Sequence, residues 1–253
     1  MNARPLLALD ATSNMWAEPP WPTAFELARL LPANSWTLVG GLMVKLHAAL
    51  AGLPAGRTTT DVDSALHLET SAISFADAAA RLSHAGFELD QSTTYAYRFD
   101  RGTERIDVMC SDRHAIGKSP RFDGRPLFGI AGGTRALQET IDVDVTTTAG
   151  LIRIVLPSVR GALVLKGAAY QEDSRDRARH AEDGVMLLAC IDDPASVVSG
   201  LSARSRGRIR SLFTALAQSR APWAPHDRVV QALARESAEV LGKELSIKFT
   251  ASD

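Results

Sequence analysis

The sequence has no long apolar run, few aromatic residues and few cysteines. No run approaches the roughly 20 apolar residues that a membrane-spanning helix requires. Residues 1–14 carry a single arginine and only a brief apolar patch, which is too little for a signal peptide. The two cysteines, Cys110 and Cys190, lie in apolar contexts and are expected to be free, buried thiols. Because no disulfide is needed, we expect a cytoplasmic protein without membrane contact.

The chain also lacks an excess of charge of either sign. Its 28 lysine and arginine residues are balanced by 29 acidic residues, which gives a formal net charge of −1. Such a balance provides no overall attraction to nucleic acid and argues against nonspecific DNA coating, although a local basic patch stays possible. With 253 residues and 45% hydrophobic content, the chain is long enough for one large or two small globular domains.

The most informative stretch runs over residues 36–63. It begins with a short apolar segment, continues with Gly40 and Gly41, and then places leucines at helical spacing. A glycine pair between a strand and a helix allows a sharp turn and a close approach to a ligand. The start of a helix also has free N–H groups and a positive dipole end, which favour phosphate. This order predicts a strand, a glycine turn and a helix that can hold a phosphate group.

Two aspartates, Asp61 and Asp63, close this stretch with Val62 between them. In a strand, alternate side chains point to the same face, so both carboxylates are expected on one side with Val62 in the core. Adjacent carboxylates repel each other unless a cation lies between them, and hard oxygen ligands suit Mg²⁺. The alternative is a solvated acidic pair at the end of a strand. The glycine turn and helix upstream favour nucleotide chemistry instead.

A third acidic residue, Asp107, lies in an apolar segment that reads as the second strand of a hairpin, 95–99 with 105–109. An aspartate inside an apolar strand is poorly tolerated unless it faces water, a cation or a metal. Two-metal phosphoryl transfer uses carboxylates that bridge the ions and one more that helps to activate the attacking hydroxyl. Asp107 fits this role. The alternative is a solvent-facing aspartate paired with Arg105.

Residues 40–63 resemble the signature of the nucleotidyltransferase superfamily, which has the fold of DNA polymerase beta. That signature is Gly-Gly or Gly-Ser, a helix, and then Asp-x-Asp on the next strand. The similarity is strongest to the toxins of abortive-infection type toxin–antitoxin systems, whose Arg-x-Ser/Thr-x-Asp-hydrophobic-Asp pattern is matched by residues 57–63. The resemblance implies an α/β (α+β) fold with a mixed sheet flanked by helices and a helical C-terminal region.

The resemblance also implies site residues far from this stretch. In these toxins a helix with a lysine precedes an arginine-rich loop and a Lys/His-x-x-Asp motif, which correspond here to Lys166 and Asp183. The lysine is expected to meet the nucleotide phosphates, as a compact cation can. Alternatives are a surface lysine and an ion pair of Asp183 with Arg179. His180 stands where the family often has lysine, and its role stays open.

The reaction implied is the Mg²⁺-dependent transfer of a nucleoside monophosphate from an NTP to an acceptor hydroxyl. The relatives suggest an RNA acceptor such as a tRNA end, and a cognate antitoxin as a partner. A small-molecule, antibiotic-type acceptor and a catalytically silent nucleotide-binding module are the alternatives. The expected catalytic and metal-binding residues are Asp61, Asp63 and Asp107. The expected nucleotide-binding residues are Gly40, Gly41, Arg57, Lys166 and Asp183.

The chain divides near residue 157 by its composition. An α/β catalytic domain is expected over residues 1–156 and a helical domain over 157–253, with an irregular arm in the first twenty or so residues and a loop over 111–130. A second Asp-x-Asp at Asp142 and Asp144 follows another glycine pair, but too few residues separate them for a helix and a return loop. We therefore interpret these aspartates as a solvated strand face. The cluster from Arg175 to Arg179 reads as a charged loop that could also meet phosphate.

Overall fold

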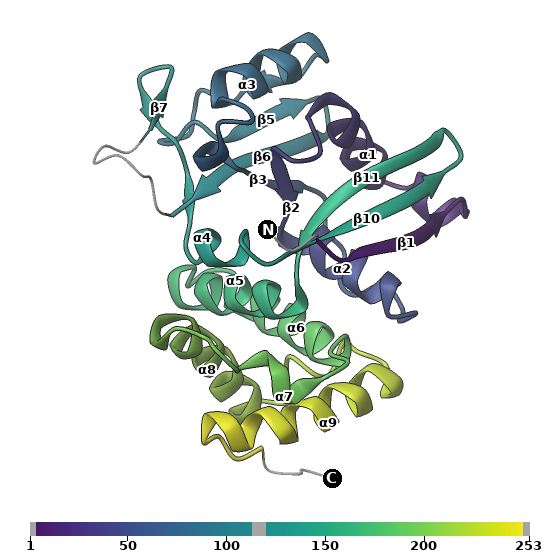
Figure 1. Cartoon of the computed structure of the whole chain (residues 1–253), viewed down its shortest axis with the longest axis vertical. Helices are drawn as coiled ribbons and strands as arrows, with labels where there is room; N and C mark the ends of the chain where they lie inside the picture. The colour runs from purple at the N-terminus through teal and green to yellow at the C-terminus, as the bar shows by residue number, and fades with distance from the viewer. Residues whose placement is uncertain (1–3, 113–119, 250–253) are drawn as a thin grey trace. The chain divides into compact units, whose positions relative to one another are not determined.

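The structure is a computed structural model that describes residues 4–112 and 120–249. The chain forms two compact units, Met1–Leu42 with Thr59–Ser158 and Met43–Thr58 with Val159–Asp253. Figure 1 shows the chain coloured from its N-terminus to its C-terminus. The predicted domains, 1–156 and 157–253, differ from these units mainly in the segment 43–58. As independent domains they stay a prediction.

The first unit is built on a mixed sheet with the strand order β2-β3-β6-β5-β4, and β9 pairs with β6 beyond the end of β5 (Figure 1). The strands β3 and β6 are parallel, whereas β2 and β5 run antiparallel to their neighbours. Because β3 and β6 are neighbouring parallel strands, residues in register on the two strands lie side by side in the sheet. The strands are β2 (Trp36–Leu38), β3 (Val62–Leu66), β4 (Glu88–Leu89), β5 (Arg98–Arg101), β6 (Glu104–Ser111) and β9 (Gly129–Ile130).

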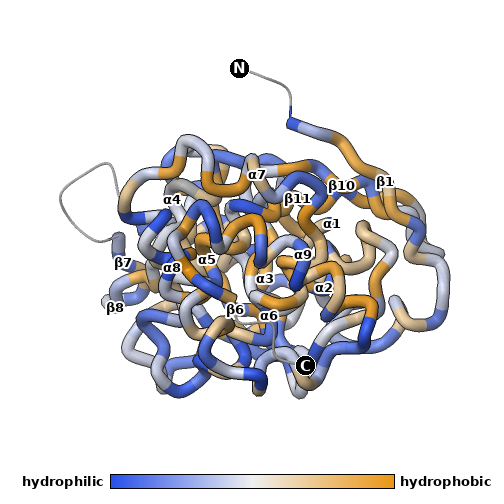
Figure 2. Tube along the Cα trace, turned by 90° about the horizontal axis from the view of Figure 1, so that it is seen from below, coloured by the Kyte–Doolittle hydropathy of each residue, from blue (hydrophilic) through white to orange (hydrophobic). Residues whose placement is uncertain are grey.

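A second sheet in this unit has the order β1-β10-β11. Its strands are β1 (Leu6–Ala11), β10 (Thr140–Thr147) and β11 (Gly150–Pro157), with β1 parallel and β11 antiparallel to β10. The expectation of an irregular N-terminal arm is therefore wrong for residues 6–11. Figure 2 shows β1 mostly in hydrophobic colours, in keeping with its leucines and alanines.

The helices of the first unit are α1 (Trp21–Leu30), α3 (Phe75–His84) and the short α4 (Gly133–Ala136), with 3-10 turns at Asn14–Ala17 and Leu68–Thr70. Helix α3 begins with a capping box, in which Ser74 and Asp77 satisfy each other's backbone N–H groups. The predicted loop over 111–130 contains a small hairpin, β7 (Arg121–Phe122) with β8 (Arg125–Pro126), as well as β9. Short strands of this kind leave too little pattern to be recognised in a sequence.

The second unit is helical. It contains α5 (Val159–Glu172), α6 (Arg177–Ala189), α7 (Pro194–Val197), α8 (Ala203–Gln218) and α9 (Arg228–Leu245). Helix α2 (Gly40–Leu50) begins in the first unit and ends in the second. Side-chain oxygens of Ser202 and Asp227 cap α8 and α9, as the sequence pattern favours. Gly167 of α5 lets the backbone of Arg208 in α8 approach, since a Cβ there would lie 2.4 Å from the Arg208 carbonyl oxygen.

The predicted fold class is confirmed: a mixed sheet is accompanied by helices and is followed by a helical C-terminal region. Both cysteines are free and buried, as expected. In the part of the chain that the structure describes, no helix is both long enough and apolar enough to cross a membrane.

Candidate active site

The three predicted catalytic carboxylates come from the start of β3, from the residue before it and from the middle of β6. Asp63 and Asp107 are direct register partners across the parallel strands, and the Ser64 hydroxyl donates a hydrogen bond of 3.2 Å to the Asp107 carbonyl. Asp61 immediately precedes β3 and accepts a hydrogen bond of 2.8 Å from the Thr60 hydroxyl. Val62 is fully buried between the two aspartates of the motif, as the alternation predicts. Folding therefore brings Asp107 to Asp63 from 44 residues farther along the chain, counted from their positions in the sequence.

Gly40 has a role here that the sequence did not predict. Its φ of +68° is in the left-handed region, which favours glycine. A Cβ at this position would lie 1.8 Å from Oδ2 of Asp63, so only glycine leaves room for that carboxylate. Asp63 thus lies against the first residue of α2, where the positive end of the helix dipole favours a negative charge.

Asp107 is buried and is held by Arg98. The Arg98 guanidinium donates two hydrogen bonds, 2.9 Å to Oδ1 and 2.8 Å to Oδ2, in a bidentate pair across β5 and β6. Burial raises the pKa of Asp107, the Arg98 guanidinium opposes this shift, and the nearby Asp61 adds to it. Asp61 is therefore near enough to Asp107 to act on it electrostatically. Arg98 is a residue of this candidate site that the sequence analysis did not predict.

The alternative proposed for Asp107, a solvent-facing residue paired with Arg105, is wrong. Asp107 is 6% exposed, and Arg105 bonds Asp100 at 2.8 Å. The predicted hairpin loop was too long, because Arg101 and Glu104 already pair and leave a two-residue turn at Gly102 and Thr103. Counting back from that shorter turn places Arg98 opposite Asp107, so a sequence signal for this pair existed.

The second unit holds the predicted distal residues in a cluster of its own. Asp183 of α6 accepts a bond of 2.6 Å from Lys166 Nζ of α5 and bonds of 2.9 and 3.0 Å from Arg57. The side chains of Lys166 and Asp183 are only 5% and 4% exposed. Burial raises the pKa of Asp183, but Lys166 and Arg57 outweigh this effect and leave it below its ordinary value. A surface role for Lys166 and an ion pair of Asp183 with Arg179 are therefore both wrong.

His180 lies in the same cluster, one helical turn before Asp183. In the described part of the chain neither of its ring nitrogens has a hydrogen-bond partner, and Asp173 is 3.9 Å from Nε2. Burial, reinforced by the charge of Lys166, lowers the pKa of His180 to about 4, so the ring is neutral at pH 7. Of the neighbouring arginines, Arg175 is solvated and Arg179 is 3.8 Å from Asp176, as expected of a charged loop.

The second Asp-x-Asp lies on β10, away from the carboxylates of β3 and β6. Asp144 forms a bidentate pair with Arg153 of β11, and Asp142 lies 3.4 Å from Arg4. These aspartates belong to a strand face with compensating arginines, in agreement with the interpretation of this motif as structural.

Comparison with known proteins gives limited results. No protein-family model and no curated protein matches the chain. A solution structure of the antibiotic-resistance factor ANT(2'')-Ia is similar with 12% identity and a TM-score of 0.33, covering 88% of this chain and 97% of that one. A crystal structure of ANT(2")-Ia in complex with adenylyl-2"-tobramycin is similar with 13% identity and a TM-score of 0.30, covering 85% of this chain and 92% of that one.

Proposed function

We propose that this protein is a nucleotidyltransferase, which moves a nucleoside monophosphate from an NTP to an acceptor hydroxyl. The observation that supports this proposal best is the register of Asp63 with Asp107 across parallel β3 and β6, with Gly40 against Asp63 at the start of α2. Asp61 acts electrostatically on Asp107 and would complete an acidic group on β3 and β6. Such a group beside a glycine turn and a helix start suits a cation and a triphosphate.

The donor set fits Mg²⁺ by its chemistry, since carboxylate oxygens are the ligands that this ion prefers. Among residues 4–112 and 120–249, no group of three or more acidic, histidine or cysteine side chains is arranged to hold a metal. Both oxygens of Asp107 accept hydrogen bonds from Arg98 in this arrangement. Asp61, Asp63 and Asp107 would hold the ion once Arg98 releases an oxygen. When bound, Mg²⁺ would neutralise triphosphate charge and favour ionisation of the acceptor hydroxyl.

The chain's own residues would position the reactants. The acceptor oxygen attacks the α-phosphorus, the bond from that phosphorus to the bridging oxygen breaks, and pyrophosphate leaves. Asp107 would receive the proton of the acceptor hydroxyl, and the burial that raises its pKa makes it a better proton acceptor. Arg98, once released from Asp107, would offset charge on the phosphates. Catalysis would thus rest on positioning and electrostatic stabilisation.

The nucleotide-binding roles of Gly40, Gly41, Arg57, Lys166 and Asp183 are part of the same proposal. Two cations, Arg57 and Lys166, share the single carboxylate of Asp183. Asp173, 3.9 Å from the neutral His180, adds a second negative charge at the margin of this cluster. Arg57 and Lys166 would meet a phosphate, whereas Asp183 would hold the two cations in place.

For the acceptor we propose an RNA end, with a tRNA end as the first substrate to test and a cognate antitoxin as the expected regulator. A small-molecule acceptor is the alternative within the same reaction. One of the similar solved structures contains adenylyl-2"-tobramycin, so aminoglycosides belong in the test. A silent nucleotide-binding module is a second candidate function, and the engagement of both Asp107 oxygens by Arg98 favours it.

The test is incubation of the protein with each α-labelled NTP, Mg²⁺, and either total tRNA or an aminoglycoside panel. We expect label on one acceptor, complete loss of transfer in Asp61→Ala, and an unchanged thermal unfolding midpoint, because Asp61 lies before β3 and is partly exposed. Asp142→Ala, in the structural Asp-x-Asp, is the matched control and should keep full activity. Transfer that persists in Asp61→Ala would refute the assignment, and binding of Mg²⁺–NTP without transfer would favour the silent module.

A further inference from the structure

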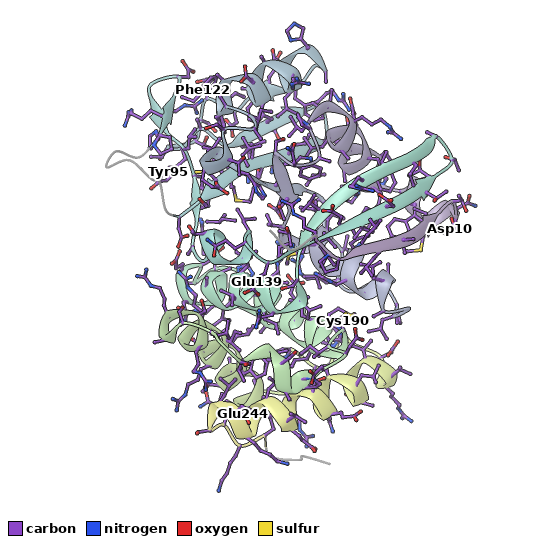
Figure 3. All side chains as sticks on the ribbon, in the orientation of Figure 1. Asp10, Tyr95, Phe122, Glu139, Cys190 and Glu244 are labelled. Carbon is purple, nitrogen blue, oxygen red and sulfur yellow. The ribbon has the colours of Figure 1, made fainter. Side chains whose placement is uncertain are left out.

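Tyr95 and Phe128 are exceptional among the aromatic side chains. They are 41% and 37% exposed, whereas every other aromatic residue that the structure describes is buried or partly buried. Exposed aromatic rings lose hydrophobic stabilisation, so a pair of them in contact marks a surface that another molecule can cover. Figure 3 labels Tyr95, which lies in the first unit on the side where β7 is drawn.

The two rings form a continuous aromatic surface with Tyr97. Tyr95 and Phe128 meet edge to face, with centroids 5.4 Å apart, and the Tyr97 ring lies 5.2 Å from Phe128 at an interplanar angle of 35°. These three residues are called the aromatic surface below. Their arrangement presents ring faces in more than one direction, so a flat ligand can stack on one ring and contact another at its edge.

The backbone that carries Tyr95 is firmly held. Arg125 of β8 donates hydrogen bonds of 2.7 Å to the Asp90 carbonyl and 3.2 Å to the Thr93 carbonyl. Ala96 donates a backbone bond of 2.9 Å to Pro126 and forms a parallel bridge with Leu127. A ring on a loop fixed in this way loses little further freedom when a ligand binds, which preserves affinity.

The aromatic surface adjoins the candidate active site through Arg98. The Arg98 guanidinium lies 5.1 Å from the centre of the Tyr97 ring and bonds both oxygens of Asp107. In the strand order β2-β3-β6-β5, Gly40 follows β2 while Tyr97 precedes β5, so the carboxylates of β3 and β6 lie between them. If the triphosphate lies at Gly40, the aromatic surface is on the side of Asp107 and hence of the acceptor.

We propose that the aromatic surface of Tyr95, Tyr97 and Phe128 stacks a nucleobase of a single-stranded acceptor, next to the hydroxyl that receives the nucleotide. This inference rests on the proposed transferase function, because only a transferase has an acceptor. The stacking itself can be measured without catalysis. Every nucleobase has a flat π face, and stacking on an aromatic side chain changes affinity by about 5- to 150-fold per base. Arg98 beside Tyr97 can in addition meet a backbone phosphate.

The chemistry of the rings supports this choice of ligand. A net charge of −1 provides no general attraction for a polyanion, so an oligonucleotide must gain its affinity from local contacts such as stacking. A nucleobase presents a flat π face to the three rings, whereas the saturated rings of an aminoglycoside present none.

The experiment measures binding of a 5′-fluorescein tetraribonucleotide, rA4, to the full chain by anisotropy at low salt, without NTP. The same oligomer with an abasic 3′-terminal nucleotide is the second probe, because the terminal hydroxyl is the proposed acceptor. We expect Tyr95→Ala and Phe128→Ala to bind rA4 at least about fivefold more weakly than wild type. In these variants rA4 and the abasic oligomer should bind equally, whereas wild type should prefer rA4.

Two variants control for surface changes. Tyr95→Phe keeps the ring and should bind like wild type. Leu151→Ala removes a side chain that is 65% exposed on β11, in the other sheet, and should leave binding unchanged. The inference is overturned if Tyr95→Ala and Phe128→Ala bind rA4 like wild type, if Leu151→Ala loses as much affinity, or if the ring variants weaken both probes equally. Nucleotide transfer with unaffected rA4 binding would reject the surface alone, and base-dependent binding without transfer to any acceptor would reject the transferase function alone.

Discussion

At the scale of single residues, Arg98 decides whether Asp107 can bind a cation. Both oxygens of this buried carboxylate accept hydrogen bonds from the Arg98 guanidinium, so Mg²⁺ and Arg98 compete for them. A hydrogen bond to a charged group contributes about 1.5–3 kcal/mol. We therefore expect Arg98→Met to lower the apparent Kd for Mn²⁺, measured by calorimetry at pH 8 without nucleotide, by about tenfold or more.

The hairpin that carries Arg98 also supplies a matched control. Arg105 bonds Asp100 at 2.8 Å and is 38% exposed, so Arg105→Met removes the same charge and a similar contact while the Asp107 oxygens keep their bonds to Arg98. Its Kd for Mn²⁺ should stay within about twofold of the wild-type value. An unchanged or higher Kd in Arg98→Met would show that Asp107 does not take part in metal binding, and the three-carboxylate site would then be wrong.

At the scale of elements, the turn from β2 into α2 depends on one glycine. Gly40 combines a φ of +68° with a position at which a Cβ would lie 1.8 Å from Oδ2 of Asp63. The left-handed conformation alone costs a residue with a Cβ about 1–2 kcal/mol. Because Asp63 must also move, we expect Gly40→Ala to lower the free energy of unfolding by about 2–4 kcal/mol, measured by urea denaturation.

A glycine at the other end of α2 separates the cost of the left-handed conformation from the cost of moving Asp63. Gly52 follows α2 with a nearly identical φ of +67°, and nothing lies within 4 Å of its hypothetical Cβ. Gly52→Ala should therefore show the conformational cost alone, about 1–2 kcal/mol. Equal losses in the two variants would mean that Asp63 yields easily to a methyl group, in which case its carboxylate is not held by the glycine turn.

The elements differ in how far the sequence predicts them. Apolar spacing and alternation predict α2 and β3, because each buries one face or both. Strand β1 was missed, since a short apolar run amid prolines and polar residues matches no periodic template. The hairpin of β5 and β6 was predicted, but its register depends on a two-residue turn, and the longer predicted loop hid Arg98.

At the scale of the whole chain, Arg57 shows what a sequence cannot reveal. It is expected to bind the nucleotide, and in the structure it bonds Asp183, 126 positions away in the sequence. No local periodicity connects two segments so far apart, because their pairing depends on how the helices of the second unit pack. The segment 43–58 belongs to that unit although it comes early in the chain, and Arg57 is one of its anchors there.

Asp183 should therefore contribute strongly to stability, whatever it does for a nucleotide. In Asp183→Asn the Lys166 ammonium, on a side chain only 5% exposed, keeps its charge but loses its carboxylate. Removing one partner of a buried ion pair costs about 3–5 kcal/mol. We expect a loss of this size in the free energy of unfolding, measured by urea denaturation at pH 7. Glu182→Gln removes the same charge one residue away on α6 and should change stability by less than about 0.5 kcal/mol.

The double variant Asp183→Asn/Lys166→Met tests whether the buried lysine causes this loss. Replacing both members of a buried pair by uncharged side chains is often neutral, since no charge is left without a partner. Arg57, 19% exposed, can turn its guanidinium toward water. The double variant should therefore recover at least about half of the stability that Asp183→Asn loses. If it is as unstable as the sum of the two single variants, Lys166 and Asp183 stabilise the unit independently.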